Sequence, residues 1–146
     1  MIVGTRAEGS VLYPLHAMLL AFPIALFSSA AAFDVAYLNT AEMQWSNFAA
    51  WMLAGAQVFG GLLLVWAVIS AVLARRRGGF MRALIYLGVL AVMWVLGLVN
   101  SFHHARDAWS SVGATGLILS ILCAVLAMIA GWILHSDRIS RETASW

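Results

Sequence analysis

The charged residues of this chain are confined to a few points and leave four long stretches without any charge. These stretches are residues 9–33, 43–74, 83–105 and 108–136. Each is longer than the roughly 20 residues that a helix needs to cross the hydrocarbon core of a bilayer. A chain that is 64% hydrophobic and only 10% charged also has too few polar groups to cover a water-soluble domain. The pattern therefore predicts an integral membrane protein.

Lipid offers the backbone no hydrogen-bond partners, so that only helices or closed barrels can span it. The short alternating segments of a barrel are absent. We therefore predict an all-α fold with helices at about 14–37, 48–74, 82–102 and 112–135. Short connections make consecutive helices antiparallel neighbours. Residues 1–146 are thus expected to form a single transmembrane domain, an up-down-up-down four-helix bundle, without a convincing internal repeat in the sequence.

The arginines predict the orientation of this bundle. All eight basic residues are arginines, and only Arg106 lies on one side of the predicted membrane. The seven on the other side are Arg6, Arg75, Arg76, Arg77, Arg82, Arg138 and Arg141. By the positive-inside rule both termini are cytoplasmic. We expect a multi-pass protein of the bacterial inner (cytoplasmic) membrane, whose arginines meet anionic lipid headgroups and not nucleic acid.

One inward face can be predicted on the first helix and one on the third. His16 and Asp34 are eighteen residues apart, which is five whole helical turns. Asn100 and His104 share a face of the third helix, and His103 does not. Polar groups in membrane helices usually face the bundle interior. The other members of the two faces are Leu20, Pro23, Phe27 and Ala30 on the first helix, and Tyr86, Leu90, Met93 and Gly97 on the third.

A polar cluster is predicted at the outer surface. Its members are Asp34, Asn100, His104, Arg106 and Asp107, with Gln57 somewhat deeper. A carboxylate, an amide, an imidazole and a guanidinium at one depth can form a hydrogen-bonded network. Two interpretations follow. The cluster is either a structural latch between the loop after the third helix and the end of the first, or a binding site for a quinone headgroup, a metal or a partner.

Two histidines are predicted at the cytoplasmic end. His16 lies near the start of the first helix and His135 at the end of the fourth. Histidines from two helices can ligate a b-type haem in a slot lined by small residues. The other interpretation of His135 is a hydrated residue beside the carbonyls of the helix C-terminus. Together with His104, these are the imidazoles that a cofactor could use, and the identity of any cofactor stays open.

Stripes of mostly small residues, spaced by three and four, occur on two of the predicted helices. They are Gly116, Ser120, Ala124, Ala127 and Gly131 on the fourth, and Ala50, Ala54, Gln57 and Gly61 on the second. Such stripes let helix backbones approach closely in lipid. They predict either ordinary contacts within the bundle or a smooth surface for a flat cofactor or a partner helix.

Two segments resemble a bacterial inner-membrane family of unknown function, domain-of-unknown-function family 2231. LHAMLLAFPIALF, residues 15–27, is similar to its opening signature His-x-Met-Leu-x-x-Phe-Pro-Ile-Ala-Leu, and NSFHHARDAW, residues 100–109, resembles the motif of one branch. Ala17 stands where the pattern usually has proline. The resemblance implies a four-helix membrane protein, and a redox setting through relatives joined to Rieske-type domains. It points to His16, Asp34, His104, Arg106 and Asp107.

The sequence contains no recognisable catalytic motif, so an enzyme is not favoured. Ionisable residues gather at the two surfaces and not at the midplane, which argues against transport. We expect a non-catalytic membrane subunit or accessory protein of a respiratory or other electron-transfer complex, docking on other membrane subunits through its small-residue faces and outer polar loop. The alternative is an electron carrier that holds b-type haem or quinone.

Overall fold

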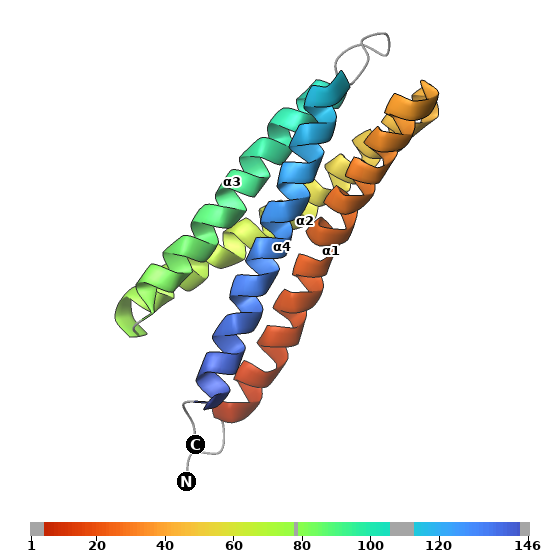
Figure 1. Cartoon of the computed structure of the whole chain (residues 1–146). Helices are drawn as coiled ribbons and strands as arrows, with labels where there is room; N and C mark the ends of the chain where they lie inside the picture. The colour runs from red at the N-terminus through yellow and green to blue at the C-terminus, as the bar shows by residue number, and fades with distance from the viewer. Residues whose placement is uncertain (1–4, 78, 106–112, 144–146) are drawn as a thin grey trace.

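The structure, a computed structural model, describes residues 5–77, 79–105 and 113–143 (Figure 1). These ranges form four α-helices: α1 (Thr5–Thr40), α2 (Met43–Arg77), α3 (Phe80–Ala105) and α4 (Gly113–Thr143). Each helix contains a stretch that is long and apolar enough to cross a membrane. Within the described residues the fold is therefore all-α with four candidate spans, as predicted.

The helices extend beyond the predicted spans. α1 begins at Thr5 instead of near residue 14, and α4 continues to Thr143 instead of ending near residue 135. The prediction followed hydrophobicity, whereas helical hydrogen bonding continues through polar residues that lie outside the hydrocarbon. The 36 residues of α1 correspond to about 54 Å at 1.5 Å per residue, which exceeds a hydrocarbon core of about 30 Å.

Two left-handed residues mark the short connections. Ala41 has a φ of 56° and donates its N–H to the carbonyl oxygen of Tyr37 at 2.7 Å, which ends α1. Such a residue satisfies a carbonyl that the helix leaves open, although a side chain makes the conformation costly. Gly79 has a φ of 84°, which glycine adopts freely, and α3 begins directly after it.

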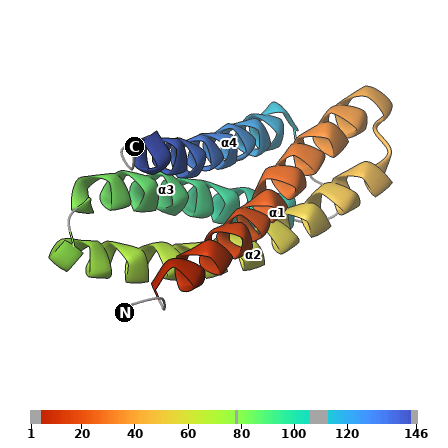
Figure 2. The ribbon, with the colours of Figure 1, turned by 90° about the horizontal axis from the view of Figure 1, so that it is seen from below.

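The four helices pack in a ring, and successive helices run in opposite directions (Figures 1 and 2). α1 lies beside α2 and α4, and α3 lies beside the same two helices, so that α1 and α3 are diagonal and parallel. The end of the bundle where α1 and α3 begin is called the His16 end below. The opposite end is called the Asp34 end.

α1 and α3 share one pattern of burial at an offset of 70 residues. α2 begins at residue 43 and α4 at residue 113. On α1 the buried positions are His16, Leu20, Pro23, Phe27, Ala30 and Asp34, and on α3 they are Tyr86, Leu90, Met93, Gly97 and Asn100, followed by the His104 side chain. The hairpins α1–α2 and α3–α4 are thus arranged about an approximate two-fold axis along the bundle, and α1 and α3 place their buried residues in the same register. The sequence hides this repeat because equivalent positions carry different side chains.

Equivalent residues of the repeat face each other across this axis. The Phe27 ring fills the space in front of Gly97, where a Cβ atom would lie 2.8 Å from Phe27 Cζ. Large apolar side chains remain exposed on every helix, and Met18, Trp51, Met81 and Trp132 are the most exposed of them on α1 to α4. The interior is therefore filled by unlike pairs, and the exterior suits contact with lipid.

Candidate functional site

The Asp34 end contains a buried ionisable pair that joins α1 to α3. His104 Nε2 lies 2.8 Å from Asp34 Oδ1, and the two side chains are 0% and 2% exposed. Asp34 and His104 are equivalent positions of the repeat, so the two parallel helices hold them at the same level. The sequence analysis placed both residues in one cluster, and the structure brings them into direct contact.

Two further side chains extend this pair. Ser120 of α4 donates its hydroxyl proton to Asp34 Oδ2 at 2.6 Å, and Asn100 Nδ2 donates to Ser120 Oγ at 2.8 Å. Because a carboxylate only accepts, the serine proton is used on Asp34 and the serine lone pair is left for the asparagine amide. We call these four residues, Asp34, Asn100, His104 and Ser120, the clasp. It ties together α1, α3 and α4.

The geometry determines how many protons Asp34 and His104 carry together. His104 Nδ1 lies 3.0 Å from the carbonyl oxygen of Asn100, which can only accept, so Nδ1 carries a proton. The contact between His104 Nε2 and Asp34 needs one more proton, on either the ring or the carboxyl group. Both assignments leave the pair without net charge, as an apolar interior favours. Chemically, the Asp34 carboxyl group and the Nε2 atom of His104 can share one proton.

A second hydrogen bond crosses the bundle at the His16 end. Tyr86 Oη and His16 Nε2 are 2.9 Å apart, and the His16 ring stacks on Trp66 of α2 with 5.1 Å between centroids. The two diagonal bonds are eighteen residues apart on each helix, which is about 27 Å at 1.5 Å per residue. This separation is close to the thickness of a hydrocarbon core. The bundle is therefore tied across its centre at two levels that are about as far apart as the edges of such a core.

His135 does not share the surroundings of His16. Its Nδ1 lies 3.3 Å from the hydroxyl of Tyr13, on the exposed side of α1 one turn before His16. His16 Nε2 instead faces Tyr86 in the interior. A bis-histidine haem site needs both imidazoles directed into one slot, and these two have different partners. Among the described residues, no group of three or more His, Cys, Asp or Glu side chains could hold a metal ion.

Gln57 lies between α2 and α3, deeper than the clasp. Its amide packs against Gly97, where a methyl group would collide with Gln57 Nε2. Both amide atoms are buried without a hydrogen-bond partner among the described residues, and Asn100 Oδ1 is in the same situation. The Gln57 backbone carbonyl, in contrast, accepts a hydrogen bond from Trp94 Nε1 at 3.1 Å. Buried amide atoms without partners are uncommon in folded proteins.

The small-residue stripe of α4 is used inside the bundle. Gly116, Ser120, Ala124 and Ala127 are buried, and Gly131 is half-buried. The stripe of α2 is its counterpart at an offset of 70 residues, but there Ala54 is exposed. Contact between helices of one chain therefore accounts for the α4 stripe, and the α2 stripe is the one with an outward-facing member.

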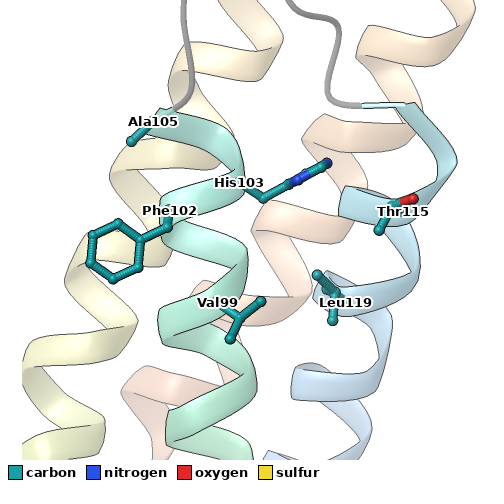
Figure 3. Close-up of a pocket in the computed structure, with 6 residues that line it drawn as sticks. All are labelled: Val99, Phe102, His103, Ala105, Thr115 and Leu119. Carbon is teal, nitrogen blue, oxygen red and sulfur yellow. The ribbon is translucent and has the colours of Figure 1, made fainter.

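Two open hollows flank the end of α3. One has a volume of about 520 Å³ and lies between α3 and α4, with the His103 ring pointing across it toward Thr115, and with Val99 and Leu119 further along the same two helices (Figure 3). The other, of about 490 Å³, lies between α3 and α2 and has polar lining side chains from Gln44, Ser46 and Asn47. Both combine polar and apolar lining near the Asp34 end.

The sequence analysis found some of these residues and missed others. It grouped Asp34, Asn100 and His104, but it treated Ser120 only as a small residue and did not pair Tyr86 with His16. The available signal for Ser120 was that its hydroxyl lies on the small-residue stripe of α4, at the depth of the ionisable Asp34. Arg106 and Asp107 lie outside the described residues, so the predicted contacts of Arg106 are not placed.

Comparisons with known proteins identify a family and no annotated relative. A family model described as "Predicted membrane protein (DUF2231)" matches residues 12–133, which include most of all four helices. This is the family that the sequence resembles. No curated protein and no solved structure matches the chain.

Proposed function

Because the chain belongs to the DUF2231 family of predicted membrane proteins, we propose that it is a non-catalytic integral membrane subunit or accessory protein of a respiratory or other electron-transfer complex. We place it in the bacterial inner membrane, with both termini in the cytoplasm, from the distribution of its arginines. The observation that carries this proposal is the clasp. Its four side chains are buried, and each makes a hydrogen bond to another helix of the same chain.

Ionisable side chains inside a membrane protein are costly and usually mark a functional site. In this chain the charge-bearing atoms of Asp34 and His104 face each other and are closed off from the surface. Such a pair supports one rigid arrangement of helices better than it supports a reaction with a substrate. A rigid bundle with an apolar exterior suits a role in assembly.

The proposed docking face lies on α2. Trp51, Ala54 and Val58 are spaced by three and four residues, so they share one face, and all three are exposed. The small side chain of Ala54 between two large ones would let a partner helix approach closely. The redox setting of the partner rests on the Rieske-linked relatives that the family resemblance implies.

Gentle extraction of a tagged chromosomal copy, followed by native electrophoresis and mass spectrometry, tests this proposal. We expect the chain to migrate with a larger assembly that has a redox absorption spectrum. Ala54→Leu should release the chain from this assembly, and Ala25→Leu, the same change at an exposed position of α1, should not. Migration of the wild-type chain alone, or with partners that have no redox centre, would contradict the proposal.

An electron carrier that holds quinone is the second candidate. The hollow in Figure 3 favours it, because His103 and Thr115 provide hydrogen-bonding groups beside the apolar side chains of Val99 and Leu119. Organic extraction of the purified protein would then yield quinone in a fixed ratio to the chain, and His103→Ala would lower that ratio. A Soret band that disappears in His16→Ala would instead indicate haem.

A further inference from the structure

Three buried polar atoms gather beside Gly97. They are Nε2 and Oε1 of Gln57 and Oδ1 of Asn100, none of which has a hydrogen-bond partner among the described residues. The Gln57 amide occupies the space that a side chain at Gly97 would take. Asn100 is on the same buried face of α3, one turn further on. An unpaired buried amide atom is unfavourable, so three together call for an explanation.

Rotating the Asn100 amide does not remove the problem. Asn100 Nδ2 donates to Ser120 Oγ, whose own proton is used on Asp34. If the amide were turned over, Asn100 Oδ1 would face a hydroxyl that has no proton left to donate. The clasp therefore holds the amide in one orientation and leaves Asn100 Oδ1 as an open acceptor.

The other half of the bundle has no amide at the matching offsets. At an offset of 70 residues, the counterpart of Gln57 is Ala127 and the counterpart of Asn100 is Ala30, and both alanines are fully buried. The other half of the bundle thus fills the same positions with methyl groups. The two amides occur together on the α2–α3 side only, where the counterpart of Phe27 is Gly97.

From this arrangement we infer that Gln57 and Asn100 bind one water molecule inside the bundle, beside Gly97. Gln57 Nε2 packs against Gly97, and Asn100 follows Gly97 by three residues, about one helical turn, so the two amides lie against neighbouring turns of α3. A water at that place donates to Asn100 Oδ1 and accepts from Gln57 Nε2, which gives it the two or more polar partners that buried waters have.

This water extends the clasp toward the middle of the membrane. The hydrogen-bonded series then runs from His104 and Asp34 through Ser120 and Asn100 to Gln57. It stops at the apolar layer formed by Leu20, Leu90, Met93 and Leu63. The water site involves no docking partner, so the outcome of its test does not depend on the proposed accessory function.

The direction in which one substitution shifts the unfolding temperature tests the water site. Gln57→Met keeps nearly the same length and volume but removes the amide. If the amide is paired through water, this variant should unfold at a lower temperature than the wild type. If the amide is unpaired, its removal should raise the unfolding temperature. Gln44→Met is the matched control, because it makes the same change at an exposed position of the same helix and should leave the temperature unchanged.

An experimental structure in lipid nanodiscs, at a resolution that shows ordered solvent, provides the direct measurement. We expect density within hydrogen-bonding distance of Asn100 Oδ1 and of the Gln57 amide. A direct hydrogen bond between the two side chains without such density would overturn the proposal, and so would a higher unfolding temperature for Gln57→Met.

Discussion

Replacing His104 by alanine should destabilise the bundle far more than replacing His103, its neighbour in sequence. The His104 ring is closed off from the surface and bonded to Asp34 and to the Asn100 carbonyl. The His103 ring lines an open hollow. After His104→Ala, Asp34 keeps Ser120 as a partner but loses the group that shares a proton with it. The Asp34 carboxyl group would then be left buried without this partner, either as an uncompensated charge or as an O–H donor without an acceptor.

The expected magnitude follows from this geometry. Removing one partner of a buried ion pair costs about 3–5 kcal/mol, because the other charge stays in an apolar interior. A substitution at a site without buried contacts usually changes stability by less than about 0.5 kcal/mol. His104→Ala should therefore lower the free energy of unfolding by about 3–5 kcal/mol, and His103→Ala by much less.

Cys123 provides the assay. It is the single cysteine of the chain and is fully buried in the core. A fluorogenic thiol reagent therefore reacts with it when the helices separate, and the midpoint of labelling during heating or denaturant titration reports unfolding without an added probe. The two histidine variants keep this reporter unchanged.

Equal labelling midpoints for His104→Ala and His103→Ala would refute the argument. A second variant tests its electrostatic part. Asp34→Asn introduced into the His104→Ala background removes the uncompensated charge while keeping the shape of the side chain. The double variant should be more stable than His104→Ala alone, and a further loss of stability would show that the buried charge is not the cause.

Four further predictions use the same labelling assay or a topological one. Gly97→Ala should cost about 1–3 kcal/mol, since its methyl would collide with the amide and the ring packed there, whereas Gly88→Ala, which has open space, should not destabilise. Ala41→Gly should raise the free energy of unfolding by up to about 1 kcal/mol, because glycine adopts the left-handed conformation of residue 41 without the strain that alanine has there. A lower free energy of unfolding would show that this strain is absent. Tyr86→Phe should cost about 1 kcal/mol through one lost buried hydrogen bond, and no change would mean that this bond contributes nothing. A cysteine placed beside Arg76 should react with an impermeant reagent from the cytoplasmic side only, and labelling from outside would reverse the orientation.

Much of the architecture could be predicted from the sequence, because lipid imposes strict rules. The four charge-free stretches require helices, and the eighteen-residue spacing of His16 and Asp34 places both on one face. The same helical period places His104 on the inward face of α3 and His103 outside that face. These predictions need only the helical repeat and the cost of polar groups in hydrocarbon, which do not depend on what a helix packs against.

Which residues contact the inward faces of α1 and α3 depended on tertiary packing. Sequence reasoning placed Asp34, Asn100 and His104 in one cluster without saying which of them bond, and the structure pairs Asp34 with the buried His104 and Ser120. Which residues meet depends on how far each helix is rotated and shifted against the others. The Phe27 ring in front of Gly97 is one contact that sets this shift between α1 and α3.

By itself, then, the sequence determined that the chain has four stretches long and apolar enough to cross a membrane, and which faces of α1 and α3 turn inward, because periodicity and solvation act within single helices. Only the tertiary structure revealed the 70-residue repeat and the two hydrogen bonds that cross its axis. These arise from complementary unlike side chains at equivalent levels, a large ring opposite a glycine and a carboxyl group opposite an imidazole. Such complementarity exists only between segments that folding has brought together.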